Sequence, residues 1–255
     1  DDEIALINLK DGLTLKTISN EIKTPYIQEL EMHLEELEKG GYEHFMLKEI
    51  YEQPQSILDS MRGRISVNQS HVGLGGIKNY EEKLINANRL IFVACGTSWH
   101  AGLVGEYLFE EIARIPVEVE YASEFRYKNP IITDKDIVIA ISQSGETADT
   151  LAALELAKEN GALTLGICNV VGSSITRTTS GGTYTHAAPE IGVASTKAFT
   201  TQVTVLLLYA LRFSQLRKTV DRENYDQLIN ELNKTPNRIE NLLNLNEEIE
   251  KLYII

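Results

Sequence analysis

The sequence predicts a three-layer α/β/α domain built on a five-stranded parallel sheet of the flavodoxin-like type. Short apolar runs that are typical of buried strands alternate with helical stretches from about residue 45 to residue 215. The connections between these runs are about a dozen residues or longer, which favours right-handed crossovers between parallel strands. Residues 137–141 are five consecutive apolar residues, four of them β-branched, as expected for a strand covered on both faces.

The first 42 residues are expected to lie outside this domain. Residues 3–7 and 13–18 predict two short strands joined by a Lys-Asp-Gly turn at 10–12. Because an isolated hairpin is marginal in water, this one is expected to be the edge of a larger domain. Residues 20–42 are rich in glutamate and predict a linker or a solvated helix.

The remaining elements follow in chain order. Residues 44–61 predict two helices broken at Gln53-Pro54. The expected strands of the sheet are 90–94, 117–121, 137–141, 163–167 and 183–187. Residues 197–211 predict a long, very apolar helix, and residues 221–255 predict charged amphipathic helix around Pro236. The apolar helix offers a surface to bury against a second copy, so we expect a homodimer.

Composition excludes several classes of function. The net charge of -13, with lysine and arginine spread along the chain, argues against a nucleic-acid partner. No apolar run reaches the ~20 residues needed to cross a membrane. Cys95 and Cys168 each end an apolar strand pattern, which suits buried, reduced thiols and a cytoplasmic protein. The histidines show no spacing typical of a metal site, so no metal is expected.

Hydroxyl-rich turns follow the first and third expected strands. Cys95-Gly-Thr-Ser98 and Ser142-Gln-Ser-Gly-Glu-Thr147 each lead from a buried strand into a helix. In the strand order 2-1-3-4-5 these two strands are neighbours, and a crevice opens between their carboxyl ends. Residues 190–197 repeat the pattern before the apolar helix. Because helix starts favour anions, the three segments predict a small polyhydroxylated ligand that bears a phosphate.

Capping is the simpler explanation for any one of these turns, because serine and threonine are the usual N-caps. However, Ser142, Ser144 and Thr147 lie within six residues, where one cap would suffice. The turns contain neither Gly-x-x-x-x-Gly-Lys-Ser/Thr nor Gly-x-Gly-x-x-Gly, which disfavours ATP and NAD. No cofactor is therefore expected.

The same segments match strings of a known family. Cys95-Gly-Thr-Ser98, Ser142-Gln-Ser-Gly-Glu-Thr147 and Val193-Ala-Ser-Thr-Lys-Ala-Phe199 resemble the first sugar isomerase (SIS) domain of glutamine:fructose-6-phosphate aminotransferases. Residues 48–54, 123–127 and 189–193 match as well, and the resemblance covers about residues 43–215. It implies a site in which the sugar phosphate is held by Ser142, Gln143, Ser144 and Thr147, and the sugar body is contacted by Thr97, Ser98, Val193 and Ser195.

The resemblance also implies that the catalytic groups lie elsewhere. Family enzymes begin with a glutaminase domain whose N-terminal cysteine releases ammonia, and a second SIS domain supplies a glutamate base, a histidine for ring opening and a lysine. We therefore expect residues 1–42 to be the end of a glutaminase domain with its linker, and residues 216–255 to be a helical connection toward a second SIS domain. No catalytic residue is expected in this chain, which alone should be inactive.

Charged side chains near the turns have simple structural interpretations. Glu146 is expected to be a first-turn residue favoured by the helix dipole, not a base. His100 is expected to be structural. Lys197 is expected to be a solvated or helix-surface lysine, with electrostatic support of phosphate binding as the alternative. Glu124 and Arg126 are expected to pair with each other, with a pair to another subunit as the alternative.

The function implied by the resemblance is the fructose 6-phosphate-binding half of an enzyme that makes glucosamine 6-phosphate for UDP-N-acetylglucosamine biosynthesis. Two alternatives remain open: a sugar-phosphate-sensing module without chemistry, and another phosphosugar isomerase. Residues 62–64, 73–76 and 172–177 resemble the eukaryotic enzymes, in which this domain binds UDP-N-acetylglucosamine as a feedback inhibitor. Inhibitor binding is thus a further hypothesis.

Overall fold

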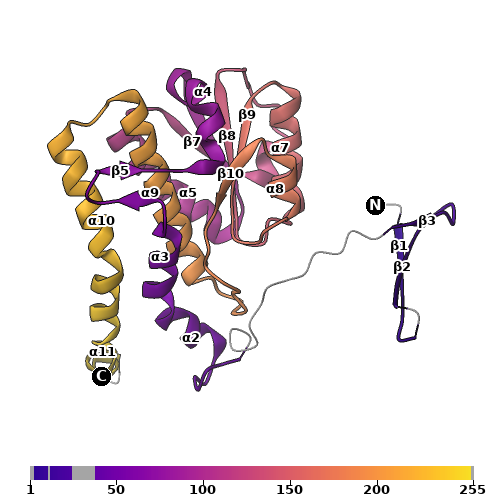
Figure 1. Cartoon of the computed structure of the whole chain (residues 1–255), viewed down its shortest axis with the longest axis horizontal. Coiled ribbons are helices and arrows are strands. Elements are labelled where there is room, and N and C mark those ends of the chain that lie inside the picture. Colours follow the sequence, from indigo (N-terminus) through magenta and orange to yellow (C-terminus); the bar gives the residue numbers. More distant parts are fainter. Residues whose placement is uncertain (1–2, 11, 25–37, 254–255) are drawn as a thin grey trace. The chain divides into compact units, whose positions relative to one another are not determined.

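A computed structural model of the chain describes residues 3–10, 12–24 and 38–253. The chain divides into two compact units, Asp1–Glu38 and Lys39–Ile255, which are described separately. Figure 1 shows the elements of each unit. None of the helices in the described ranges is both long enough and apolar enough to span a bilayer.

The N-terminal unit is a small antiparallel sheet. Strands β1 (Glu3–Asn8) and β2 (Gly12–Thr17) form the predicted hairpin, and β3 (Ile22–Lys23) adds a short third strand beside β2. The sequence did not predict β3 because two residues are too few to show a strand period. Most of the predicted linker falls on residues 25–37, which lie outside the described ranges.

The larger unit contains the predicted parallel sheet. Its strands are β6 (Arg89–Ala94), β7 (Val117–Tyr121), β8 (Asp136–Ser142), β9 (Leu163–Cys168) and β10 (Gly181–Tyr184). The spatial order β10-β9-β8-β6-β7 is the expected 2-1-3-4-5, and all four pairings are parallel. Only β10 is displaced, starting two residues early, because Gly181 and Gly182 carry no strand signal.

Alternating strand residues build a core on each face of the sheet. Leu90 and Phe92 point into one core with α9, while Ile91 and Val93 point into the other with α7. The first face is covered by α3 (Gln53–Met61), α4 (Glu81–Asn86), α5 (Gly96–Leu108), the π-helical segment Phe109–Ala113 and α9 (Lys197–Arg217). The second is covered by α6 (Ala122–Phe125), α7 (Ala148–Glu159) and α8 (Ser174–Thr178). The three-layer prediction is confirmed (Figure 1).

Shorter elements precede the sheet, and two helices follow α9. Helix α2 (Phe45–Tyr51) is separated from α3 at Glu52, so the break predicted at Gln53-Pro54 is confirmed within one residue. A hairpin of β4 (Ile65–Ser66) and β5 (His71–Val72) leads to a 3-10 segment, Gly75–Tyr80. At the C-terminal end, α10 (Arg222–Leu243) includes Pro236 and α11 (Asn246–Tyr253) follows it.

Helix α9 lies in the core of its own chain. Leu206, Tyr209 and Phe213 are each 0% exposed, and the helix packs against α5 and α3. The expectation that this apolar helix presents a docking surface to a second copy is therefore wrong. Its apolar length reflects burial between other helices and the sheet, which a sequence period cannot distinguish from an interface.

Candidate functional site

The candidate site is built at the carboxyl edge of the sheet, where the chain leaves neighbouring strands β6 and β8. Ala94 pairs with Ile141 at the end of these strands, so the turns that lead into α5 and α7 start side by side. The third segment is tied to the first by α9, because Gln202 Nε2 donates to Ser98 Oγ at 3.0 Å. Tertiary structure thus attaches all three hydroxyl-rich segments to one edge.

The turn at 142–147 is held in a defined shape by its own hydroxyls. Ser142 is buried and its Oγ accepts the N–H of Gly145 at 2.9 Å, while Ser144 Oγ accepts the N–H of Glu146 at 3.2 Å. Both hydroxyl hydrogens remain available to donate to a ligand. Gln143, Ser144 and Thr147 are partly exposed, so their side chains are accessible at the rim.

Gly145 is required by the packing of this turn. Its φ is +69°, and a Cβ at this position would lie 2.1 Å from Ser173 Oγ. The N–H of Ile175 donates to the Gly145 carbonyl at 2.9 Å, so the start of α8 supports the turn from behind. A glycine is therefore the residue that lets the backbone approach α8 this closely.

Helix capping does not account for the hydroxyls at the N-cap positions. Thr147 is the N-cap of α7 and Thr196 is the N-cap of α9, and neither makes a side-chain cap hydrogen bond. The first turn of α9 is capped instead by Glu190, whose Oε1 accepts the N–H groups of Thr196 at 2.9 Å and Ala198 at 3.0 Å. The Thr147 hydroxyl is left for another partner, whereas Thr196 Oγ1 is buried without a hydrogen bond, so the ligand interpretation gains support at Thr147 alone.

The residues predicted to contact the sugar body differ in exposure. Thr97 and Val193 are exposed and Ser195 is partly buried. Ser98 is 7% exposed, and its oxygen is engaged by Gln202. Ser98 thus contacts α9 at the base of the first turn, while the other three are at least partly accessible.

A family model for the SIS domain matches residues 83–212. The chain belongs to the SIS domain family. The predicted family and fold are both confirmed.

Two curated relatives of this chain have the same name. A glutamine–fructose-6-phosphate aminotransferase (isomerizing) of Bacteroides thetaiotaomicron is 57% identical over 252 residues, 99% of this chain and 41% of the relative. One from Chlorobaculum tepidum is 56% identical over 254 residues, 100% and 41% of the two chains. The chain thus spans about 41% of the length of these curated relatives.

A solved structure agrees with the fold. The C-terminal domain of glucosamine-fructose-6-phosphate aminotransferase from Francisella tularensis superposes with a TM-score of 0.79 at 36% identity, over 84% of this chain and 60% of that one. Another match, a structure from Clostridium difficile, is 21% identical with a TM-score of 0.66, over 80% of this chain and 55% of that one, and shows the fold alone.

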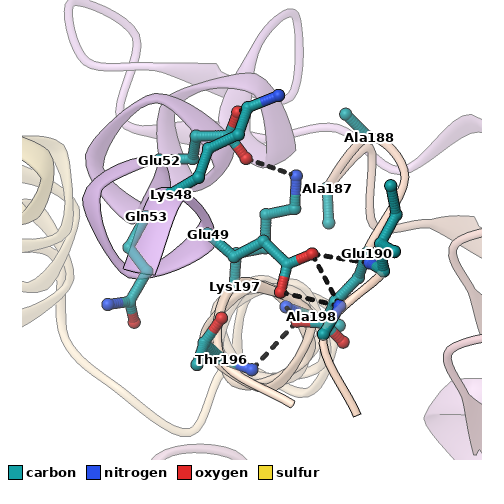
Figure 2. Close-up of polar contacts among 12 residues, drawn as sticks. Lys48, Glu49, Glu52, Gln53, Ala187, Ala188, Glu190, Thr196, Lys197 and Ala198 are labelled. Carbon is teal, nitrogen blue, oxygen red and sulfur yellow. Dashed lines mark hydrogen bonds and ion pairs between the residues drawn. The ribbon is translucent and has the colours of Figure 1, made fainter. Parts of the chain in front are cut away.

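Lys197 is buried in this SIS domain, so the prediction of a solvated lysine is wrong. It is 2% exposed, and its Nζ forms an ion pair with Glu52 Oε2 at 2.6 Å (Figure 2). Glu52 lies 145 residues earlier in the chain, at the end of α2. No local pattern links the two, and only the packing of α2 against the start of α9 gives the lysine its partner.

Glu146 serves a different helix from the one predicted. Helix α7 begins at Ala148, and Glu146 Oε1 instead accepts the N–H of Ser174 in α8 at 2.8 Å. Hydrogen bonds from Ser174, together with the charge of Arg177, lower the pKa of Glu146. A carboxylate with a lowered pKa is a weak base, which agrees with the expectation that Glu146 does not move protons in catalysis.

Two other side chains near the site have defined partners. Arg126 Nη1 pairs with Asp149 Oδ1 on α7 at 2.9 Å, so the expected local pair with Glu124 is wrong. His100 Nδ1 lies 3.1 Å from the carbonyl oxygen of Gly96, one turn earlier in α5, which is a structural contact. Among the residues that the structure describes, no three His, Cys, Asp or Glu side chains gather as a metal site would require.

The segments singled out for inhibitor binding converge on β10. Arg64 Nη2 donates to the carbonyl of Tyr184 at 2.7 Å, and the N–H of Gly172 donates to the Tyr184 hydroxyl at 3.4 Å. Gly76 lies against the backbone of Gly182. Burial lowers the pKa of Arg64, whose hydrogen bonds here go to carbonyl oxygens.

Sequence reasoning did not predict roles for Glu49, Glu190 and Gln202. All three lie in or beside strings that resemble the family, at 48–54, 189–193 and 193–199. Each holds a backbone group or a hydroxyl at the rim of the site, while none carries a local signal of that role. Their partners are set by tertiary structure.

Proposed function

We propose that this chain is the fructose 6-phosphate-binding half of the isomerase portion of a glutamine-dependent aminotransferase that makes glucosamine 6-phosphate for UDP-N-acetylglucosamine biosynthesis. The observation that carries the proposal is the edge where β6, β8 and α9 bring three family-matching, hydroxyl-bearing segments together. The name shared by relatives that are 56% and 57% identical supports it.

In this proposal the turn at 142–147 binds the phosphate. Gln143, Ser144 and Thr147 present amide and hydroxyl donors at the start of α7, where the free backbone N–H groups and the helix dipole favour an anion. Ser142 keeps the turn in shape through its bond to Gly145. Hydrogen bonds to a charged phosphate are stronger than neutral ones, so this end fixes the substrate.

The other segments orient the sugar body. Thr97, Ser98, Val193 and Ser195 are proposed to contact the carbon chain and its hydroxyls. Ammonia would add to the open-chain ketose carbonyl with loss of water, and a proton shift between the first two carbons would convert the imine to the amino sugar. The base for that shift is proposed to come from a second SIS domain, so the contribution of this chain is positioning.

The proposal includes the partners of the chain. Residues 1–42 are assigned to the end of a glutaminase domain with its linker, residues 43–215 to the first SIS domain and residues 216–255 to a connection to the second. We also propose a homodimer in the cytoplasm. Since α9 is buried, the exposed apolar side chains of the last two helices and their connection are the better candidates for protein contacts: Leu242, Leu245, Ile249 and Leu252.

Calorimetric titration with fructose 6-phosphate tests the proposal. Ser144→Ala removes one hydroxyl from the proposed phosphate turn, so binding should weaken by ~1.5–3 kcal/mol, about tenfold or more. Thr235→Ala, on the distant helix α10, is the matched control and should bind as the wild type does. Unchanged affinity in Ser144→Ala would reject the phosphate assignment.

An assay of glucosamine 6-phosphate formation distinguishes the proposed function from a sensing module and from another phosphosugar isomerase. The full-length polypeptide that contains this chain should form glucosamine 6-phosphate from fructose 6-phosphate and glutamine. Sugar binding without any turnover would indicate a sensing module, and conversion of fructose 6-phosphate to another sugar phosphate without glutamine or ammonia would indicate another phosphosugar isomerase.

A further inference from the structure

The segment 188–196, between β10 and α9, carries two of the proposed sugar contacts but has no regular secondary structure. Val193 and Ile191 are exposed, and the segment has no strand partner to set its backbone. A binding loop of this kind must be held by other contacts if its side chains are to keep one position. The structure shows which contacts hold it.

A buried carboxylate holds the middle of the segment. Glu49 of α2 is 2% exposed, and its Oε1 accepts the N–H groups of Ile191 at 2.5 Å and Gly192 at 3.0 Å (Figure 2). Hydrogen bonds from backbone N–H groups to an ionised carboxylate are among the stronger ones in proteins. They fix the backbone immediately before Val193.

The approach of α2 to the segment leaves no room for a side chain at Gly192. A Cβ there would lie 2.5 Å from Glu49 Oε2 and 3.4 Å from Met46 Cα. The φ of Gly192 is not in the left-handed region, so an added side chain would meet the Glu49 carboxylate without straining the backbone. Glu49 thus accepts the N–H of Gly192, and the missing side chain of Gly192 leaves room for the Glu49 carboxylate.

Other charges hold the end of the segment. The Glu190 carboxylate accepts backbone N–H groups at the start of α9. Lys197, the first residue of that helix, forms an ion pair with Glu52, which is the C-cap residue of α2. The segment is thus anchored to α2 at two places, through Glu49 and through the pair of Lys197 with Glu52. Helix α2 lies before residues 83–212, the part of the chain that the family model matches.

We propose that Glu49 is a positioning residue of the sugar site, which sets the backbone of 191–192 so that Val193 and Ser195 meet the sugar body. The inference rests on the proposed function. Glu49 is buried and bonded to backbone, so it acts through the segment and does not touch the ligand in this proposal. The phosphate turn lies on a different segment and does not depend on it.

Comparing the affinities for two ligands distinguishes a positioning role of Glu49 from general damage to the fold. Fructose 6-phosphate engages both the phosphate turn and the 193–195 rim, whereas inorganic phosphate engages only the turn. Calorimetric titration of Glu49→Gln should show fructose 6-phosphate binding weakened about tenfold or more, with phosphate affinity within about twofold of wild type. Gly192→Ala should give the same pattern, because its Cβ displaces the carboxylate.

Asp136→Asn is the matched control. Asp136 is also a buried carboxylate that accepts a backbone N–H, from Thr133 at 2.7 Å, but it lies at the opposite end of the sheet. This variant should lower the stability and leave both affinities unchanged.

The outcomes distinguish the inference from the proposed function. Failure of the wild type to bind fructose 6-phosphate overturns the proposed function and with it any role of Glu49 in sugar binding. Equal fructose 6-phosphate affinity in Glu49→Gln and wild type, or equal loss of both ligands, overturns the positioning role alone. If Glu49→Gln does not fold, amide hydrogen exchange of the wild type decides: slow exchange at Ile191 and Gly192 supports the anchor, and unprotected exchange there rejects it.

Discussion

Replacing Gly145 by alanine tests the shape of the phosphate turn directly. The position combines a φ of +69° with close packing, since an added Cβ would lie 2.1 Å from Ser173 Oγ and 2.5 Å from Ser173 Cβ. Neither contact is open to relaxation without moving α8 or the turn, because the N–H of Ile175 also bonds to the Gly145 carbonyl.

The expected cost has two parts. A non-glycine residue in the left-handed region costs about 1–2 kcal/mol. Forcing an extra methyl group into a packed site costs about 1–3 kcal/mol. Gly145→Ala should therefore lower the free energy of unfolding by about 2–5 kcal/mol, and the displaced turn should also weaken phosphate binding.

Urea unfolding measures the cost. Trp99 is the only tryptophan and stacks on Tyr121 at a ring distance of 4.2 Å, so its fluorescence reports on the larger unit. Gly145→Ala combined with Ser173→Gly should recover the steric part and retain the backbone part. Gly75→Ala is the matched control, because its Cβ would meet no atom within 4 Å and its φ is not left-handed.

The reasoning would be refuted by a Gly145→Ala variant whose unfolding midpoint and slope match those of the wild type. A double variant no more stable than Gly145→Ala would refute the steric part alone. In that case the positive φ, and not the contact with Ser173, would account for the glycine.

Three further predictions concern charge and ligands. Burial opposes ionisation of Asp136, but hydrogen bonds from Arg89 and Thr133 outweigh it and lower the pKa of Asp136 below 3.8. The contribution of Asp136 to the free energy of unfolding should therefore be present above pH 3.8 and be lost as the pH falls through the pKa of the folded state. Acid unfolding of Asp136→Asn should lack this step. Burial raises the pKa of Cys168 to about 12, so a thiol reagent at pH 8 should modify Cys95 and spare Cys168 until the protein unfolds. If the inhibitor hypothesis holds, UDP-N-acetylglucosamine should bind the wild type and bind Arg64→Ala more weakly, and no heat at millimolar ligand would reject it.

Local sequence patterns predicted the sheet and the edge at which two of the hydroxyl-rich turns meet. The run Ile137–Ile141, the break near Pro54 and the order of the five strands depend on side-chain period and on the handedness of crossovers. These are properties of contiguous residues, or of connections between successive elements. The same rules predicted that the turns at 95–98 and 142–147 lie on one edge, and the pairing of β6 with β8 confirms it.

Tertiary structure decided which groups meet across long stretches of chain. Lys197 forms an ion pair with Glu52, and Glu49 accepts the backbone N–H of Gly192. Glu146 accepts a backbone N–H of α8 and not one of α7. Helix α9 has the composition of an interface yet fills the core. The physical reason is that burial and charge pairing depend on residues that are distant in the sequence and are brought together by packing. The residues next to each position along the chain therefore do not predict its partners. The sequence by itself therefore determined the fold class and the segments proposed to form the site, whereas only the packed structure determined what holds those segments in place.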